Sequence, residues 1–226
     1  MATRTRGAER REEPLSRERI VEAAIALLDS AGEGGLTFRV LAERLATGPG
    51  AIYWHIAGKE ELLNAATDAV IAETVAGGTT DTTPREAIRA LALGVFDAIE
   101  AHPWVGTQLS RAPGQSPMLR VFEHIGRQVQ ALGVPRQAQF TAASAFLNYI
   151  LGVGGQNAAD ARAHQARRPG TSRTDFLDAA AAAWSELDPD EYAFLRSVAD
   201  QLRVHDDRAE FLAGIDLILT GITAGH

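Results

Sequence analysis

Cysteine is absent from this chain, and lysine is nearly so. The 226 residues include no cysteine, and all basic side chains except Lys59 are arginine. Without cysteine the chain cannot form a disulfide framework or a thiolate metal site, and the composition fits a reducing cytosol. The N-terminus also lacks the apolar stretch of a secretory signal, so we expect a cytoplasmic protein.

A long apolar run is missing as well. The longest stretch without a charged residue, 137–159, is long enough to span a membrane, but it contains three glutamines, two asparagines and three glycines. This composition favours a buried or interfacial helix, and no membrane partner is expected. Alternation of apolar and polar residues, the pattern of a strand, is not found either, so the sequence predicts an all-α fold.

Positive charge is scarce for a protein that coats nucleic acid. The net charge is −7, although residues 1–11 carry +3 and residues 12–63 carry −4. This balance argues against non-specific nucleic-acid binding. It remains compatible with specific DNA recognition, in which a few placed contacts to phosphate fix the register of the protein.

Groups that could perform catalysis or hold a metal are not apparent. The run His205-Asp206-Asp207 resembles a metal cluster, but an aspartate before an apolar periodic segment is ordinarily a helix N-cap. The run Gly152-Val153-Gly154-Gly155 follows no strand and lacks the glycine spacing of a phosphate loop. We therefore expect no enzymatic activity, no metal site and no cofactor.

Residues 36–59 contain the most informative pattern. Thr37 is placed to cap a helix whose apolar face includes Leu41 and Leu45, and Gly48-Pro49 opens a second helix after a tight turn. In the second helix Ile52 and Ile56 define the buried face. The polar-tipped rings of Tyr53, Trp54 and His55 therefore fan around the remaining circumference, with Trp54 about opposite Ile52.

Two short helices joined by a tight turn, with rings on the outer surface of the second, are typical of a helix-turn-helix DNA reader. The alternative is that the three rings fill the core of a small helical domain, and Tyr53 is the ring that best suits this role.

A specific set of residues between Leu15 and Ala76 closely resembles the N-terminal domain of the TetR family of transcriptional repressors, in the branch of the tetracycline repressors. Weaker landmarks lie at residues 101–104 and 211–217. The matching residues are Ile20, Ala23, Ala24, Leu27, Leu28, Gly32, Leu36, Thr37, Arg39, Leu41, Ala42, Leu45, Tyr53, Trp54, His55, Ile56, Lys59, Leu62 and Leu63.

The resemblance implies four regions. They are a disordered basic arm at 1–14, a three-helix DNA-binding domain with the helix-turn-helix at 15–58, a connecting helix at 59–77, and a helical ligand-binding and dimerisation domain at 78–226. The expected partners are double-stranded operator DNA, a small-molecule effector and a second copy of the chain. The loop 167–173, with three arginines, is expected to be solvated rather than to bind phosphate.

The residues expected to contact DNA lie in or beside the helix-turn-helix. Arg39 is the candidate for reading a base, because its guanidinium fits guanine O6 and N7. Tyr53 and His55 suit hydrogen bonds to phosphate, and Lys59 suits a phosphate anchor at the start of the next helix. The full set is Thr37, Arg39, Gly50, Ala51, Tyr53, Trp54, His55 and Lys59.

The effector is expected to bind among the aromatic residues of the C-terminal region. The candidate pocket residues are Phe96, Trp104, Phe122, Phe146, Asn148 and Trp184. Relatives that bind magnesium–tetracycline place a histidine shortly after the fifth helix, where this chain has Gln108 and Leu109, so a different effector is expected.

Dimerisation is expected to use apolar residues of the long helix and of the last helix, joined in a four-helix bundle. The candidate interface residues are Phe146, Tyr149, Ile150, Val153, Phe211, Ile215, Leu219 and Ile222. A competing interpretation is a helical small-molecule-binding protein or enzyme in which the helix-turn-helix is vestigial.

Overall fold

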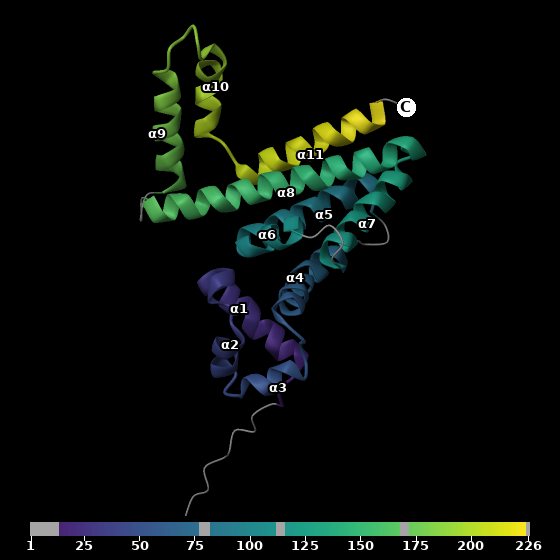
Figure 1. Cartoon of the computed structure of the whole chain (residues 1–226). Coiled ribbons are helices and arrows are strands. Elements are labelled where there is room, and N and C mark those ends of the chain that lie inside the picture. Colours follow the sequence, from purple (N-terminus) through teal and green to yellow (C-terminus); the bar gives the residue numbers. More distant parts are fainter. Residues whose placement is uncertain (1–13, 77–81, 112–115, 168–171, 225–226) are drawn as a thin grey trace, which may run out of the picture. The chain divides into compact units, whose positions relative to one another are not determined.

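Helices make up most of the backbone in the computed structural model, which describes residues 14–76, 82–111, 116–167 and 172–224 (Figure 1). No strand occurs within these ranges, and the all-α prediction is confirmed. The helices are α1 Arg17–Gly35, α2 Phe38–Arg44, α3 Pro49–Tyr53, α4 Lys59–Ala76, α5 Pro84–Ala101, α6 Pro103–Arg111, α7 Ser116–Ala131, α8 Arg136–Arg167, α9 Arg173–Ser185, α10 Ala193–Arg203 and α11 Asp207–Ala224.

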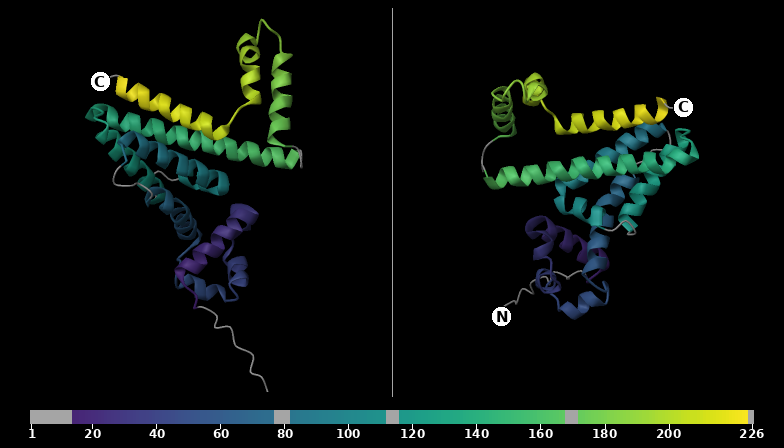
Figure 2. Two further views of the ribbon diagram at one scale, coloured as in Figure 1. Left: turned by 180° about the vertical axis from the view of Figure 1, so that it is seen from behind. Right: turned by 45° about the horizontal axis from the view of Figure 1, so that its top comes forward.

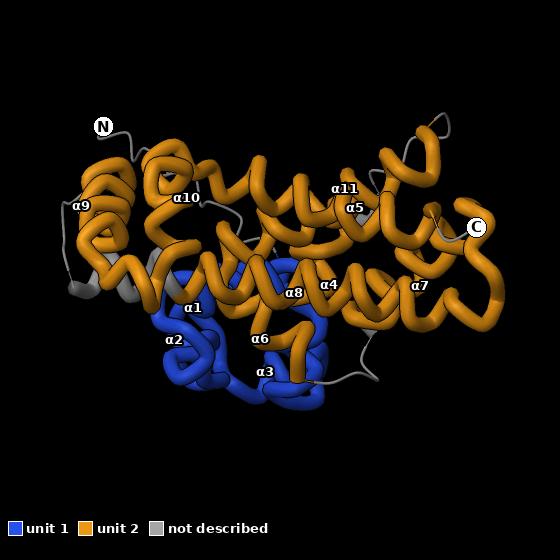
Figure 3. The backbone as a smooth tube through the Cα atoms, turned by 90° about the horizontal axis from the view of Figure 1, so that it is seen from above, with its two compact units in different colours: residues 1–66 blue, residues 67–226 orange. Residues whose placement is uncertain are grey.

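The chain divides into two compact units, residues 1–66 and 67–226 (Figure 3). The division falls inside α4 and therefore later than residue 58, where the sequence suggested a boundary. Leu62 and Ala66 in the first half of α4 are fully buried, which explains why these turns belong to the first unit. The predicted basic arm lies, up to residue 13, outside the described residues.

Side-chain caps set the beginnings of α1 and α2. The hydroxyl of Ser16 accepts a hydrogen bond from the Arg19 amide at 3.3 Å, and that of Thr37 accepts one from the Val40 amide at 3.2 Å. Each satisfies an amide that the first turn of a helix leaves without a partner. Glycine favours helix ends, which predicts the end of the first helix at Gly32, and this residue interrupts α1 with φ of 64°.

The turn between α2 and α3 closes through two backbone hydrogen bonds. The amide of Thr47 donates to the carbonyl of Ala42 at 2.9 Å, and that of Ala46 donates to Glu43 at 3.2 Å. This is the pattern of a Schellman motif, whose central residue adopts the left-handed conformation that favours glycine. Here that residue is Ala46, with φ of 51°, so the turn carries some backbone strain.

The core of the second unit contains a stack of three aromatic rings from α5, α8 and α11. Phe211 lies 4.6 Å from Phe96 and 5.6 Å from Tyr149, measured between ring centroids. The Tyr149 hydroxyl donates to the Phe211 carbonyl at 3.3 Å, and Gly214 lies against the Tyr149 ring. Burial raises the pKa of Tyr149, and the nearby Glu210 carboxylate raises it further.

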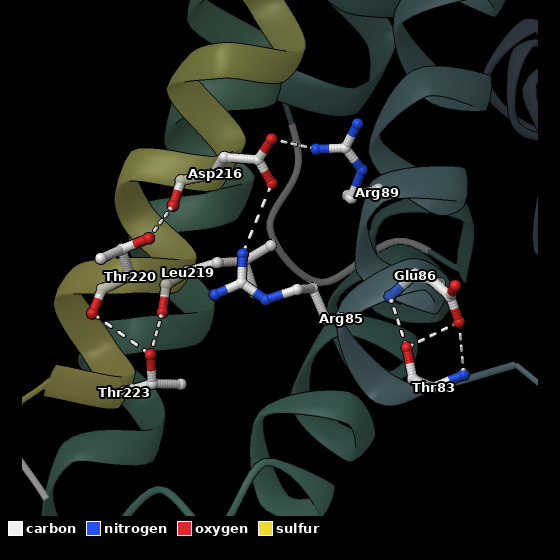
Figure 4. A network of polar contacts seen from close by, with 8 residues as sticks. All are labelled: Thr83, Arg85, Glu86, Arg89, Asp216, Leu219, Thr220 and Thr223. Atoms are coloured by element: carbon white, nitrogen blue, oxygen red, sulfur yellow. Dashed lines mark hydrogen bonds and ion pairs between the residues drawn. The ribbon is translucent and has the colours of Figure 1, made fainter.

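Ion pairs at two places fix the antiparallel register of α5 and α11. At one of them α5 supplies the arginines and α11 the aspartate, and at the other the roles are reversed. Arg89 and Arg85 of α5 both contact Asp216 of α11, the latter at 3.6 Å (Figure 4). Eight residues further along α5, Asp97 accepts from Arg208, which lies eight residues earlier in α11, at 2.6 Å. Figure 4 also shows the capping box of Thr83 and Glu86 at the start of α5.

Helices α9 and α10 lie side by side as a hairpin after the C-terminal end of α8 (Figure 2). Proline favours a helix start, which predicts the second helix from Pro189, but α10 begins at Ala193. The carboxylate of Asp188 accepts hydrogen bonds from the amides of Asp190 and Glu191, at 2.9 and 3.2 Å, and this local turn delays the helix.

The predicted dimer interface is wrong for most of its residues. Phe146, Ile150, Phe211, Ile215 and Leu219 are at most 1% exposed within a single chain. They form the core of the second unit and cannot reach another protein without its opening. The apolar periodicity of α8 and α11 correctly marked a buried face, but its partner is the same chain.

Within the described ranges, no helix is apolar enough over sufficient length to cross a membrane.

Candidate nucleic-acid interface

The helices α2 and α3 present one cationic and two aromatic side chains to the surface of the first unit. The side chain of Arg39 is 85% exposed, Tyr53 is 54% exposed and Trp54 is 89% exposed. By contrast, Ile52 is completely buried and Ile56 nearly so, which confirms the predicted orientation of this segment. A tryptophan of such exposure is unfavourable in a free monomeric surface, so the arrangement suits a surface that contacts a partner.

Tyr53 belongs both to the packing of the unit and to its surface. Its ring stacks on Phe38, with 4.5 Å between centroids and 12° between planes, while about half of the residue stays exposed. The stack fixes the direction of the phenol and leaves its outer edge available. The suggestion that Tyr53 also serves packing is therefore consistent with the geometry, and Trp54 does not share that role.

Arg39 is held loosely. Its Nε donates to the Glu43 carboxylate one helical turn away at 3.0 Å, and both side chains are well exposed. Such a pair contributes little to stability and exchanges readily for another anion or acceptor. The guanidinium thus has a preferred direction without being committed to a structural role.

The small residues at the start of α3 leave space in front of the backbone. A side chain added at Gly50 would meet no other atom within 4 Å, and Ala51 is half-buried. Thr37 is exposed while its hydroxyl caps α2. These three predicted contact residues therefore lie at the ends of the two helices, where a groove edge can approach the backbone closely.

Lys59 and His55 have partners within the protein. The Lys59 ammonium donates to the carbonyl of Glu33 at 2.7 Å, near the C-terminus of α1, where the helix dipole is negative. The carbonyl of His55 accepts from Arg17 at 2.8 Å, and the imidazole is half-buried. The roles of Lys59 and His55 at phosphate remain predictions, and Lys59 must exchange its present partner to fulfil its own.

Two residues that the sequence did not suggest, Arg17 and Glu61, hydrogen-bond to the backbone of the segment after α3, at His55 and Ala57. Arg17 donates to Glu61 at 2.6 Å, and Glu61 accepts from the Ala57 amide at 2.7 Å. The Ala57 hydrogen bond lowers the pKa of Glu61, and Arg17 lowers it further. Partners 38 and 44 residues from Arg17 leave no periodic signal, so only the folded unit reveals the contact.

The six predicted pocket residues are not brought to one place. Phe96 and Trp104 are buried on α5 and α6, and Phe146 is buried on α8, and these three helices contact one another. Phe122 is half-buried on α7, where it meets the exposed Phe140 ring edge to face at 5.9 Å between centroids.

The other two candidates lie elsewhere. Asn148 is on an exposed face of α8. Trp184 is on α9, whose main neighbour is α10. The structure therefore groups Phe96, Trp104 and Phe146 on neighbouring helices and separates Asn148 and Trp184 from them.

One carboxyl group in the second unit is incompletely paired. Oδ1 of Asp68, on α4, is buried and forms no hydrogen bond within the described part of the chain, while Oδ2 lies 3.8 Å from Arg120. Burial raises the pKa of Asp68, and Arg120 opposes that shift. The Oδ1 atom of Asp68 can therefore accept a further hydrogen bond.

The run at 205–207 is structural. Asp206 accepts from the Ala209 amide at 2.8 Å, which confirms the predicted N-cap. Asp207 accepts from Arg173 at 2.7 Å and lies 2.9 Å from the His205 imidazole. Across the described ranges no group of three potential ligands could hold a metal ion. The predicted loop 167–173 lies mostly outside the described residues, and Arg173 itself belongs to α9.

Comparison with known sequences gives matches to both units. The profile of bacterial regulatory proteins of the tetR family matches residues 20–66, and that of the tetracyclin repressor-like C-terminal domain matches residues 78–225. An HTH-type transcriptional regulator of Saccharopolyspora erythraea is 32% identical over 139 residues, 61% of this chain. The match spans 59% of the length of that regulator.

Solved structures agree over nearly the whole chain. The transcriptional regulator SCO7222, a TetR from Streptomyces coelicolor, is 60% identical with a TM-score of 0.84, over 93% of this chain and 99% of the other. The structure of BioQ with its double-stranded DNA operator is 29% identical with a TM-score of 0.57, over 85% of this chain and all of the other.

Proposed function

Because this chain belongs to the tetR family of bacterial regulatory proteins, we propose that it represses transcription in the cytoplasm as a homodimer. It binds a near-palindromic operator through the first unit and is released when an effector binds the second. The observation that carries the proposal is the exposed group of Arg39, Tyr53 and Trp54 on a two-helix scaffold whose opposite face is fully buried.

Arg39 and Tyr53 have different tasks at DNA in this proposal. Arg39 reads a base edge in the major groove, whereas Tyr53, held by its stack on Phe38, contacts phosphate. Helix α3, the second helix of the helix-turn-helix, has no glutamine, asparagine or arginine near its start, so base readout depends mainly on Arg39. The BioQ complex shows that a protein of similar fold binds operator DNA.

We expect Arg39→Ala to weaken operator binding by about 1–3 kcal/mol and to relax the preference at one position of each half-site. Tyr53→Ala should weaken binding to all sequences about equally, because a phosphate contact carries no sequence information. Fluorescence anisotropy with operators substituted at single positions measures both effects. A uniform loss for Arg39→Ala would show that Arg39 is only an anchor.

The proposed dimer uses exposed faces of α8 and α11 rather than their buried ones. Exposed residues of α8 recur at helical spacing and are small or uncharged, and α11 presents a similar stripe. They are Thr141, Ala145, Asn148, Gly152, Gln156 and Ala159 on α8, and Ala213, Leu217, Thr220, Gly221 and Ala224 on α11. Small residues let helix axes approach closely, as a four-helix bundle requires.

Such a dimer carries two copies of the reader. In a two-fold symmetric dimer the two copies of α3 can enter successive major grooves. The two half-sites of the operator then lie one turn of the DNA helix apart, about 34–36 Å. The operator is therefore expected to be a near-palindrome.

The effector is proposed to bind among α5, α6 and α8, where Phe96, Trp104 and Phe146 lie. Buried aromatic walls fit a largely apolar organic molecule. Gln108 and Leu109 stand where magnesium-dependent relatives have a metal ligand, so the effector is not expected to be a magnesium–tetracycline complex. A ligand releases DNA only if it binds the DNA-free arrangement more tightly.

The test of the function has two stages. A gel shift with the DNA upstream of its own gene, against a scrambled duplex of equal length, distinguishes a DNA-binding regulator from a protein with a vestigial helix-turn-helix. Retardation of the native duplex alone supports the regulator, whereas no retardation of either duplex contradicts it.

Coupling between the units is the second stage. A compound that raises the melting temperature of the protein is titrated with and without saturating operator. We expect operator to weaken its binding by roughly 5- to 150-fold, because the coupling is reciprocal. Equal affinities in the two titrations would mean that the protein is not an inducible regulator.

A further inference from the structure

Arg17 connects three parts of the first unit that are far apart in the sequence. As the first residue of α1, it donates from Nη1 to the carbonyl oxygen of His55 at 2.8 Å and to Oε1 of Glu61 at 2.6 Å. The other carboxylate oxygen of Glu61 accepts from the amide of Ala57 at 2.7 Å. These three hydrogen bonds join the start of α1, the segment after α3 and the first turn of α4.

The segment after α3 needs such support. α3 has five residues, and its continuation rests on two backbone hydrogen bonds, from His55 and Ile56 to the Ile52 carbonyl at 2.9 and 3.0 Å. A helix this short is not stable through its own hydrogen bonds. The carbonyl of His55 and the amide of Ala57 have no helical partner and are satisfied by Arg17 and Glu61 instead.

These hydrogen bonds hold the helix-turn-helix at residues 55–57, which the ring stack of Phe38 and Tyr53 does not include. Phe38 holds Tyr53 from the α2 side through the ring stack. The Arg17–Glu61 pair holds the backbone at residues 55 and 57 from the side of α1 and α4. Trp54 lies between these two supports in the chain, and almost all of its own surface is exposed. Its direction therefore depends on the backbone on either side of it.

We propose that Arg17 and Glu61 are positioning residues for DNA binding, which fix the backbone at residues 55–57 without themselves contacting DNA. The inference rests on the proposed DNA-binding function. It differs from a simple electrostatic role, because a surface carboxylate repels phosphate and its removal then strengthens binding. A carboxylate that positions the reader has the opposite effect when it is removed.

Glu61→Gln in the full chain distinguishes these roles by the sign of the change. We expect operator affinity to fall roughly five- to twentyfold, because a neutral amide cannot accept both hydrogen bonds as strongly as a carboxylate. The ratio of specific to non-specific affinity should fall as well. Glu22→Gln is the matched control, since it removes the same charge from an exposed position of α1 outside the network. Its affinity should stay equal or rise slightly.

Arg17→Lys tests the other end of the network while the positive charge is kept. Both hydrogen bonds leave from one nitrogen, Nη1, and a lysine side chain ends one bond short of that atom, so we expect a loss similar to that of Glu61→Gln. The double variant should be little worse than either single variant, because both remove one shared network. The slope of log affinity against log salt should stay unchanged, since no phosphate contact is lost.

The outcomes separate the inference from the function and from simple unfolding. Tighter or unchanged binding by Glu61→Gln would overturn the inference, as would a salt slope for Arg17→Gln that is smaller by about 0.9, the mark of a direct phosphate contact. A variant that is merely partly unfolded loses specific and non-specific binding in proportion, and its melting curve shows the fraction. If the unaltered protein fails to bind operator, the proposed function fails first.

Discussion

Replacing Leu219 with arginine is expected to unfold the second unit, whereas the same substitution at Leu217 is expected to leave it folded and to separate the proposed dimer. Leu219 is completely buried, and Leu217, two residues earlier on α11, is 76% exposed. A buried charge without a partner costs about 3–5 kcal/mol or more, a large part of the stability of an ordinary domain. At the exposed position the arginine meets water in the monomer and an apolar neighbour only in the dimer.

Thermal unfolding followed by circular dichroism, together with size-exclusion chromatography and light scattering, measures both variants. Each variant controls for the other, because the change in composition and charge is identical. Folded monomers from Leu219→Arg would show that Leu219 faces a second chain after all. A Leu217→Arg protein that remains dimeric would move the proposed interface away from the exposed face of α11.

Gly214→Val is expected to destabilise the second unit by about 2–4 kcal/mol. A Cβ atom at this position of α11 would collide with the ring and hydroxyl of Tyr149. The ring cannot move aside without loss, because it stacks on Phe211 and donates a hydrogen bond to the Phe211 carbonyl. Overpacking of this kind costs about 1–3 kcal/mol, and the broken hydrogen bond adds about 1 kcal/mol.

Denaturant unfolding of Gly214→Val should be compared with that of Gly126→Val. A Cβ atom at Gly126 of α7 would meet nothing within 4 Å, so the second variant should change the free energy of unfolding by less than about 0.5 kcal/mol. Equal stability of the two variants would mean that Tyr149 does not pack against α11 as described.

Local signals in the sequence predicted the helices well where the cause of a boundary is local. Ser16, Thr37 and Asp206 are of residue types that favour N-caps, and they cap α1, α2 and α11. Proline favours the first turn of a helix, and Pro49 and Pro84 open α3 and α5. Failures occurred where a neighbouring turn competes, as at Asp188, which delays α10. The sequence also did not indicate the strained turn residue. Glycine is the residue type that favours the left-handed conformation, which would point to Gly48, but Ala46 adopts it.

The functional surface was predictable to a similar degree. Helical periodicity predicts which side chains are exposed and which are buried. In agreement with it, Trp54 is exposed and Ile52 is buried. Periodicity does not say which partner covers a buried face, so residues of the core such as Ile215 were assigned to a dimer. It also carries no signal for contacts between distant segments, and Arg17 and Glu61 were missed for that reason.

The mirrored charges of α5 and α11 restrict how the second unit can change shape. A slide of α11 by one helical turn in either direction would separate Arg208 from Asp97, which are now 2.6 Å apart, and would also shift Phe211 off Phe96. The Arg208–Asp97 pair alone contributes little at the surface, but it must be lost together with the ring stack for the helix to slip. Motion of α11 along its own axis is therefore the costly mode. A probe pair that reports the offset between the two helices should consequently stay constant when the protein switches.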